Sequence, residues 1–256
     1  MNSALIGHTG FVGSNLLRQG TFEDTYNSTN IQSIAGKSYD TVWCAGVRAV
    51  KWWANQNPEE DKKGIEHLTR FLSHVKCKYF VLISTVDVFK AADGVTENTA
   101  PSADGLHPYG RHRLELEAFV ASKFPSYSII RLPGLFGEGL KKNIIYDFLY
   151  DNEVHKINSK NSFQFYDLNA IYKDCCKVIE AALPLCHFAT EPVSVADVAL
   201  NAFGVQFENI PEGSIPVHYD MRTLHAARWN KPGPYLYDRQ DVLESIASFV
   251  YRKRRQ

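Results

Sequence analysis

The stretch "SALIGHTGFVG", from Ser3 to Gly13, decides the fold of this chain. A short apolar run that ends at Gly7 predicts a buried strand, and "FVGSNLLRQG" after it predicts a helix that stops at Gly20. Between strand and helix, Gly7, Gly10 and Gly13 follow a G-x-x-G-x-x-G spacing. In such a turn one glycine permits the reversal, one lets the backbone approach a pyrophosphate, and one allows helix and sheet to pack closely. The stretch therefore predicts a dinucleotide-binding turn, with a purely structural turn as the alternative.

Beyond the turn, apolar runs alternate with longer helical stretches, which is typical of β-α-β units on a parallel sheet. Further strands are expected at residues 22–27, 39–46, 78–86 and 127–134, and helices at residues 58–75 and 108–124. After Gly134 the pattern loosens, although Ser194 looks like a helix cap. We predict an α/β fold. A doubly wound parallel Rossmann sheet spans residues 1–134 and a smaller C-terminal substrate-binding lobe spans residues 135–256, with some late segments returning to the first domain.

The composition limits the classes of function. Of 256 residues, 45% are apolar and 22% charged, and 28 basic residues balance 28 acidic ones. A balanced charge gives no field that attracts nucleic acid or an anionic membrane. We expect no signal peptide, and no apolar run approaches the roughly 18 residues that a membrane helix needs. We therefore expect a cytoplasmic protein with no nucleic-acid or membrane partner and no metal, whose five cysteines are buried free thiols.

The expected second strand bears on the choice of dinucleotide. NAD sites usually place an acidic residue at the end of this strand, where it accepts hydrogen bonds from the ribose. Here Glu23 and Asp24 lie at the start of the strand, and Asn27 and Ser28 follow at its exit. Neutral groups at the exit would tolerate a 2′-phosphate, so the residues favour NADP weakly and leave NAD open.

A serine–threonine pair and a tyrosine are the candidates for proton chemistry. The motif "ISTVDVF" puts Ser84 and Thr85 at the end of a strand, and Tyr109 follows Thr85 by 24 residues at the start of a predicted helix. Arg113 lies four positions after Tyr109, on the same helix face. Three other tyrosines, among them Tyr127, also have arginine at this spacing, so the spacing alone identifies nothing.

Together these motifs resemble one family. The segments "GHTGFVG", "ISTVDVF", "PYGRHRLELE", "RLPGLFGEG" and "ATEPVSV" resemble the extended short-chain dehydrogenases/reductases, in particular their nucleotide-sugar epimerase, dehydratase and reductase group. The resemblance runs from end to end and is best up to about Gly134. It implies the Rossmann fold, an NAD(P) cofactor, a nucleotide-sugar substrate and a possible homodimer formed through the helix of Tyr109.

The resemblance also implies catalytic roles. Tyr109 would exchange the proton that accompanies hydride transfer, and Thr85, or else Ser84, would hold the substrate oxygen. Arg113 stands where the family has lysine, so it would lower the pKa of the Tyr109 phenol and bond the nicotinamide ribose. On this reasoning, Arg113→Lys should retain or raise activity. A second departure is Gly64, at a position where the family often has asparagine.

Further contacts follow from the same resemblance. The cofactor would contact Gly7, Thr9, Gly10, Phe11, Val12, Gly13, Asn27, Ser28, Cys44, Ala45, Gly46, Tyr109, Arg113 and Pro133. The substrate would contact Asp87, Asn143, Gln164, Tyr166 and Arg222. Plainer interpretations stay open for the second group, because Asp87 also fits a surface carboxylate, Asn143 a solvated helix start, and alternating aromatic residues around Gln164 a packed core.

The motifs and the resemblance together favour an enzyme. We expect an NAD(P)-dependent oxidoreductase or epimerase that acts on a nucleotide-activated sugar, with a dehydratase the least favoured of the three chemistries. The alternative is a non-catalytic NAD(P)-binding sensor or assembly subunit on the same fold, which Arg113 and Gly64 favour and which similarity of fold cannot exclude.

Overall fold

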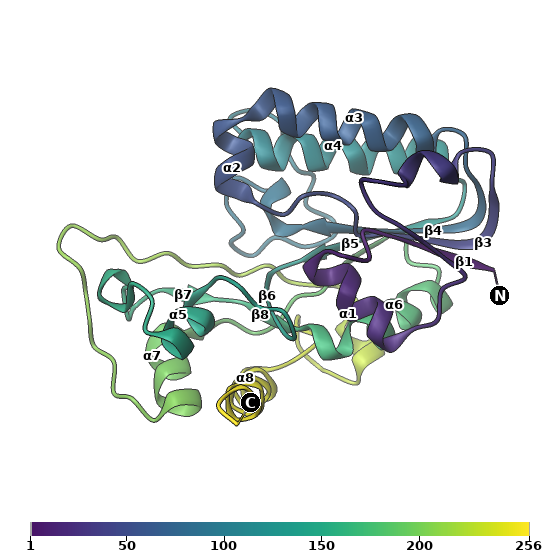
Figure 1. Cartoon of the computed structure of the whole chain (residues 1–256). Coiled ribbons are helices and arrows are strands. Elements are labelled where there is room, and N and C mark those ends of the chain that lie inside the picture. Colours follow the sequence, from purple (N-terminus) through teal and green to yellow (C-terminus); the bar gives the residue numbers. More distant parts are fainter. Residues whose placement is uncertain (1, 256) are drawn as a thin grey trace. The chain divides into compact units, whose positions relative to one another are not determined.

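In the computed structural model, which describes residues 2–255, β1 (Ser3–Ile6) lies inside a six-stranded parallel sheet (Figure 1). The strand order is β2-β1-β3-β4-β5-β9. All residues of β1 are buried, as expected for a strand that is covered on both faces. The other strands are β2 (Asp24–Tyr26), β3 (Ser38–Cys44), β4 (Lys76–Thr85), β5 (Tyr127–Leu132) and β9 (Leu185–His187).

Helices cover both faces of this sheet, so the prediction of a doubly wound parallel sheet is confirmed (Figure 1). On one face, α3 (Pro58–Leu72) and α4 (Pro108–Lys123) pack together beside the short α2 (Lys51–Gln56). On the other face, α1 (Phe11–Gln19) packs with α6 (Ile171–Glu180). Both α3 and α4 begin with proline, whose missing N–H costs nothing in a first helical turn.

Two sets of apolar contacts hold these layers together. Under α3 and α4, side chains such as Ile6, Leu82 and Leu116 form one buried cluster, each contributing about 1.5–3 kcal/mol by burial. On the opposite face, the ring of Tyr172 in α6 stacks on Trp43 with their centroids 5.3 Å apart. A Cβ atom on Gly20 would lie 2.3 Å from the Tyr172 ring, so the end of α1 can approach α6 only because this residue is glycine.

The remaining elements form a second unit with its own core. β6 (Gly134–Phe136) pairs in parallel with β8 (Phe165–Asp167), and β7 (Ser162–Phe163) pairs antiparallel with β10 (Val193–Ser194). The helices are α5 (Ile144–Tyr150), α7 (Val195–Val198), which runs on into a π-helical turn at Ala199–Phe203, and α8 (Arg239–Lys253). Their apolar faces meet around buried side chains such as Phe136, Phe165 and Ile246.

Local sequence explains where these elements begin. Ser194 caps α7 in a reciprocal capping box with Asp197, which confirms the predicted cap, and Asp238 caps α8 in the same way. Short 3-10 segments complete the chain at Ile31–Ile34, Val86–Val88, Val154–Lys156, Leu168–Ala170 and Ala226–Trp229.

The two units do not divide the chain with a single cut. The first unit contains the residues up to Lys90 together with Thr99–Arg131 and Asn169–Cys186, and the second contains Ala91–Asn98, Leu132–Leu168 and the residues from His187 on. Three segments thus differ from the boundary placed at residue 134 from the sequence: 91–98 and 132–134 belong to the second unit, and 169–186 return to the first.

Two further observations concern the chain as a whole. Among residues 2–255, no helix has both the length and the apolar character needed to cross a membrane. All five cysteines carry free thiols, and Cys44, Cys175 and Cys186 are buried.

Candidate active site

The glycine turn between β1 and α1 is built on two very close backbone approaches. Gly7 has a φ of +85°, which favours glycine, and a Cβ atom on it would lie 2.4 Å from the Ala45 oxygen. A Cβ atom on Gly13 would lie 2.0 Å from the Gly7 oxygen. At Gly10, by contrast, the nearest atom would be 3.3 Å away. Gly7 and Gly13 are therefore needed for packing, whereas Gly10 is the glycine whose open side would admit a ligand.

The turn after β3 lies against this glycine turn. Cys44 is buried at the end of β3, and the Ala45 N–H donates to the Ile6 oxygen at 2.9 Å. A Cβ atom on Gly46 would lie 2.7 Å from the Ile6 side chain. β1 and β3 are neighbours, and the helices that follow them, α1 and α3, lie on opposite faces of the sheet (Figure 1). Ligands of doubly wound sheets bind at such a switch point, outside the carboxyl ends of the strands.

The remaining predicted cofactor residues lie around the same edge. Thr9 is exposed in the turn, and Phe11 and Val12 open α1, whose N-cap, Gly10, has no side chain to bond the first helical N–H groups. At the exit of β2, the Asn27 side chain accepts hydrogen bonds from Thr29 and so closes a tight loop, with Ser28 exposed at its tip.

The acidic residue of β2 lies at the other end of the strand. Asp24 accepts hydrogen bonds from Lys37 at 2.8 Å and from Tyr39 at 2.5 Å, and these bonds lower the pKa of its carboxyl. It is therefore committed to a local cluster at the start of the strand, as its position in the sequence predicts.

Thr85 and Tyr109 meet at the carboxyl end of β4. Thr85 is the last residue of β4 and Tyr109 lies in the first turn of α4, and the two side chains lie close enough for Thr85 to lower the pKa of the Tyr109 phenol. The Thr85 hydroxyl also accepts from the Asp87 N–H at 3.1 Å. The phenol is only 7% exposed. The structure thus brings together two of the residues that the motifs single out.

Ser84, the alternative to Thr85, points elsewhere. Successive side chains of a strand lie on opposite faces, and the Ser84 hydroxyl donates to Glu117 at 2.5 Å. Glu117 is also held by Arg131, whose Nε and terminal nitrogen donate at 3.1 and 2.6 Å, so all three side chains are buried in one network. The Ser84 hydroxyl is therefore used in a buried hydrogen bond to Glu117. Thr85, on the other face of β4, is the better candidate of the two for binding a substrate oxygen.

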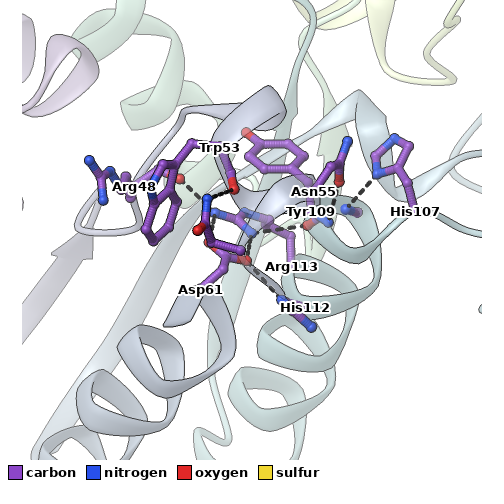
Figure 2. Close-up of polar contacts among 10 residues, drawn as sticks. Arg48, Trp53, Asn55, Asp61, His107, Tyr109, His112 and Arg113 are labelled. Carbon is purple, nitrogen blue, oxygen red and sulfur yellow. Dashed lines mark hydrogen bonds and ion pairs between the residues drawn. The ribbon is translucent and has the colours of Figure 1, made fainter. Parts of the chain in front are cut away.

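Arg113 is buried, with 4% of the residue exposed, and lies below the Tyr109 ring (Figure 2). The centre of its guanidinium is 3.9 Å from the ring centroid. Its two terminal nitrogens donate to both carboxylate oxygens of Asp61. They also donate to the backbone carbonyl oxygens of Tyr109, at 3.1 Å, and Arg48, at 2.6 Å. All four terminal N–H groups thus have acceptors within the protein. This differs from the predicted bond to a nicotinamide ribose, for which only the Nε–H would remain.

Asp61, in the first turn of α3, is the partner that sequence reasoning missed. Burial by itself would raise the pKa of this carboxyl, but hydrogen bonds from Arg113 and from His112 (2.8 Å) outweigh burial and lower it. No sequence pattern links Asp61 to Arg113, which lie 52 residues apart. The only hint of a special role for Asp61 in the sequence is that an acidic residue follows the helix start at Pro58.

Three more residues that the sequence did not single out hold the segments next to Tyr109. Asn55 in α2 accepts from the Tyr109 N–H at 3.0 Å, and His107 caps α4 by accepting from the Gly110 N–H at 3.1 Å (Figure 2). Lys51, also in α2, donates to Asp87 at 2.6 Å. The predicted substrate ligand Asp87 therefore lies beside the Thr85–Tyr109 pair with its carboxylate held by a lysine.

These neighbours act on the phenol in opposite senses. Burial, the largest effect, raises the pKa of Tyr109, the charge of Arg113 lowers it, and Asp87 raises it again. The Thr85 hydrogen bond lowers the pKa and Asp61 raises it, and the net shift is upward. Without a ligand the phenol is therefore protonated at neutral pH, which suits a group that donates a proton.

Gly110, next to Tyr109, sets the approach of α4 to this site. A Cβ atom there would lie 2.0 Å from the Asp87 backbone carbonyl oxygen. If either the backbone of α4 or that of the Asp87 turn shifted to make room, Tyr109 would move relative to Thr85. We expect Gly110→Ala to destabilise the protein by about 1–3 kcal/mol in urea unfolding, as overpacking does. Gly64→Ala is the matched control, because Gly64 lies inside α3 with no atom within 4 Å of its Cβ position. That change should stabilise the protein by about 0.5–1 kcal/mol; equal effects of the two changes would contradict the packing role of Gly110.

In the second unit, two predicted substrate ligands are instead parts of the core. Gln164 is 2% exposed, and its amide donates to the Thr190 and Met221 oxygens at 2.5 and 2.7 Å. Tyr166 is fully buried and packs 5.2 Å from the Phe188 ring. Burial removes both side chains from contact with a substrate in this structure, and we do not retain them as ligands.

The other predicted residues of this unit keep polar roles. Asn143 caps α5 by accepting from two N–H groups, at 3.0 and 3.2 Å, and donates to the Leu135 oxygen at 2.8 Å, so its amide is occupied. Arg222 forms an ion pair with Asp220 at 2.6 Å and stays partly exposed. Pro133 is half-buried between β5 and β6.

Comparisons with known proteins agree with this geometry at the level of the fold. No family model and no curated protein sequence matches the chain. Solved structures do match along its whole length. One is a dTDP-4-dehydrorhamnose reductase from Clostridium acetobutylicum, with 17% identity, a TM-score of 0.73, and coverage of 99% of this chain and 100% of that one.

Two epimerases match equally well. A UDP-glucose 4-epimerase from Thermotoga maritima, solved with UDP-glucose, has 14% identity, a TM-score of 0.72 and full coverage of both chains. A UDP-glucuronic acid 4-epimerase from Bacillus cereus, solved with NAD, has 14% identity, a TM-score of 0.73, and coverage of 98% of this chain and 99% of that one. The chain thus has the fold of nucleotide-sugar enzymes, and the resemblance stated from its motifs is confirmed for the fold.

Proposed function

We propose that this chain is an NAD(P)-dependent oxidoreductase or epimerase of a nucleotide-activated sugar, with Tyr109 as the proton donor or acceptor. The observation that carries the proposal is the pair of Thr85, the last residue of β4, and Tyr109, in the first turn of α4, whose side chains lie close together. The glycine turn follows β1, the Ala45 turn follows β3, and β1, β3 and β4 are consecutive in the sheet. In a parallel sheet these three ends lie along one edge, so a dinucleotide that spans the edge would place its reactive end near the tyrosine.

The residues at this edge fit a dinucleotide. The open side of Gly10, between the closely packed Gly7 and Gly13, suits the approach of a pyrophosphate. Bound nicotinamide would accept or supply the hydride. The neutral exit of β2, with Asn27 and Ser28, would accept NADP, whereas three of the matching solved structures hold NAD. We therefore propose NAD(P), and comparison of the dissociation constants of NAD and NADP decides between them.

The proton chemistry falls to two side chains. Thr85 would donate a hydrogen bond to the substrate oxygen and hold it, and the protonated Tyr109 would transfer its proton to that oxygen as the hydride arrives. The raised pKa of Tyr109 favours the direction in which a carbonyl is reduced. In the reverse direction the phenol must first lose its proton, and Arg113, 3.9 Å from the ring centroid, stabilises the resulting charge.

Tyr109→Phe is expected to lower kcat by about 10²–10⁴-fold, the usual contribution of general acid–base catalysis. The ring that rests on Arg113 remains, so the dissociation constant of the cofactor should not change. The measurement follows the absorbance of reduced nicotinamide over a panel of nucleotide sugars. Tyr127→Phe is the matched control, since Tyr127 also has arginine four positions on but begins strand β5. Undiminished turnover in Tyr109→Phe would refute the assignment of the proton donor.

The second candidate is a non-catalytic dinucleotide-binding protein. The observation that favours it is the guanidinium of Arg113, which is bound to Asp61 where a mobile lysine is expected. Denaturing the purified protein and identifying any released dinucleotide, and then supplying nucleotide sugars with reduced cofactor, separates the cases. Net oxidation of the cofactor indicates a reductase, and sugar conversion without net oxidation indicates an epimerase. Bound cofactor with no conversion across the panel indicates the non-catalytic protein.

A further inference from the structure

Two hydrogen bonds join the short helix α2, and Arg48 shortly before it, to α4, the helix of Tyr109. Arg113 donates to the Arg48 oxygen at 2.6 Å just before α2, and the Tyr109 N–H donates to Asn55 at 3.0 Å within it (Figure 2). Lys51 is the first residue of α2 and lies between these two points. Its backbone is therefore fixed relative to Tyr109, although it is 58 positions away in the sequence (109 minus 51).

Lys51 reaches the carboxylate that lies beside the reacting hydroxyl groups. Its Nζ is 2.6 Å from Asp87, and the Lys51 side chain is 41% exposed whereas that of Asp87 is 20% exposed. The Asp87 backbone N–H donates to the Thr85 hydroxyl, and the Asp87 carbonyl oxygen packs against Gly110, the neighbour of Tyr109. The backbone of Asp87 is therefore held next to both Thr85 and Tyr109. The Asp87 carboxylate is one of the charges that raise the pKa of the Tyr109 phenol, so a cation paired with this carboxylate affects the phenol through Asp87.

The charges around Tyr109 are nearly balanced pair by pair. Arg113 faces Asp61, which also binds His112, and Lys51 faces Asp87. The ring centroid of His107 lies 6.2 Å from that of Tyr109. The pKa of His107 is lowered first by burial and then by the charge of Lys51, and the charge of Asp87 opposes this shift. Among the described residues, the titratable and charged groups around Tyr109 are therefore Asp61 from α3, Asp87 from the turn after β4, Arg113 from α4 and the N-cap His107, with Lys51 from α2 paired to Asp87.

We propose that Lys51 is a positioning residue of this site: its ammonium holds and neutralises Asp87, and so allows Tyr109 to give up its proton. The inference rests on the proposed function, because it concerns the same tyrosine. Asp61 already offsets the charge of Arg113, and burial opposes a phenolate. An unpaired Asp87 would oppose it further, since a like charge nearby disfavours the ionised form. Lys51 neutralises the Asp87 charge. Arg113 does not, because its terminal N–H groups already donate to Asp61, Tyr109 and Arg48.

The test is a titration of the Tyr109 phenol in the full chain. Phenolate absorbance is followed against pH, and the curve of Tyr109→Phe is subtracted to isolate this residue from the other tyrosines. Lys51→Met should move the midpoint up by about one pH unit and Asp87→Asn should move it down by a similar amount, in the range for a charge at close contact. The double variant, which removes both charges, should return close to the wild-type midpoint, and Lys51→Arg should preserve it.

Two controls make the outcome specific. Lys63→Met removes an exposed lysine from α3 in the same unit and should leave the midpoint unchanged. His107→Asn removes the neighbouring imidazole but keeps a residue that caps helices well. If His107→Asn moves the midpoint and Lys51→Met does not, the role belongs to His107 and the inference is overturned.

The titration needs no substrate, so it is independent of the proposed function. If the wild type turns over a nucleotide sugar and Lys51→Met leaves both the phenol midpoint and the pH profile of kcat in place, the inference alone fails. If the midpoint moves as expected but no nucleotide sugar is converted, the proposed function alone fails. With turnover, Lys51→Met should shift the pH profile of kcat in the oxidative direction upward by about one unit, while the dissociation constant of the cofactor stays the same.

Discussion

Arg113→Lys is expected to reduce turnover at least about 10-fold and to destabilise the protein by about 1–3 kcal/mol, the cost of a buried polar group left without its partner. This reverses the expectation from the family pattern, in which lysine at this position would retain or raise activity. The guanidinium serves four acceptors, two on Asp61 and one each on Tyr109 and Arg48. A single ammonium cannot replace a planar fork that binds a carboxylate through two nitrogens.

Variants at both ends of this ion pair separate stability from chemistry. Arg113→Ala should cost about 3–5 kcal/mol in urea unfolding, because it leaves Asp61 charged and buried. Replacing both residues, as in Arg113→Met with Asp61→Leu, should recover much of that stability. Activity should not recover, because the phenol has lost its neighbouring cation.

The control for these variants is Arg111→Lys, an exposed arginine in the same helix, which should stay within about 0.5 kcal/mol of the wild type. If Arg113→Lys keeps full activity, the bonds to Arg48 and Tyr109 are dispensable and the family expectation stands.

Gly13→Ala is expected to have the other large effect. The new methyl group would lie 2.0 Å from the Gly7 oxygen, so α1 must move away from β1. Overpacking of this kind costs about 1–3 kcal/mol, and because the turn is displaced, cofactor binding should also be lost. Thermal unfolding and titration of the cofactor measure the two effects.

Gly10→Ala provides the contrast within the same turn. Its methyl group would lie 3.3 Å from the Gly7 carbonyl oxygen, a tight contact that a shift of a few tenths of an ångström relieves, so the fold should tolerate this change far better than Gly13→Ala. The methyl group would occupy the side on which a pyrophosphate approaches, and the affinity for the cofactor should fall about 10-fold or more, equivalent to about 1.4 kcal/mol. If Gly10→Ala binds the cofactor normally while Gly13→Ala unfolds, the turn serves packing only and the cofactor assignment is wrong.

The parts of the fold that the sequence predicted are those determined by neighbours along the chain. The strand, turn and helix around Gly7, Gly10 and Gly13 form one continuous stretch, and their close approaches require glycine locally. The same holds for Thr85 at the end of β4 and Tyr109 at the start of α4, each placed by the element that carries it.

The parts that could not be predicted depend on partners far apart in the sequence. No pattern joins Asp61 to Arg113 or Lys51 to Asp87, because each pair forms only when separate helices pack on the sheet. For Gln164 the sequence left two interpretations, a ligand and a core residue, and only burial separates them. Ser84 and Thr85 were open for a similar reason, since one residue of register decides which face of β4 each occupies.

The composition of the first unit has a consequence for the order in which the protein can fold. Residues up to Arg131 supply β1 to β5 and α1 to α4, but α6 and β9 come from residues 169–186, after an excursion through the second unit. A chain emerging from the ribosome would hold β5 as an open sheet edge, and the Tyr172 ring would be missing from its place beside Gly20 and Trp43, until that segment had been made. Such edges invite pairing with other chains. The late return of α6 and β9 is therefore the step that pairs β5 and leaves the three-residue strand β9 as the edge on this side of the sheet.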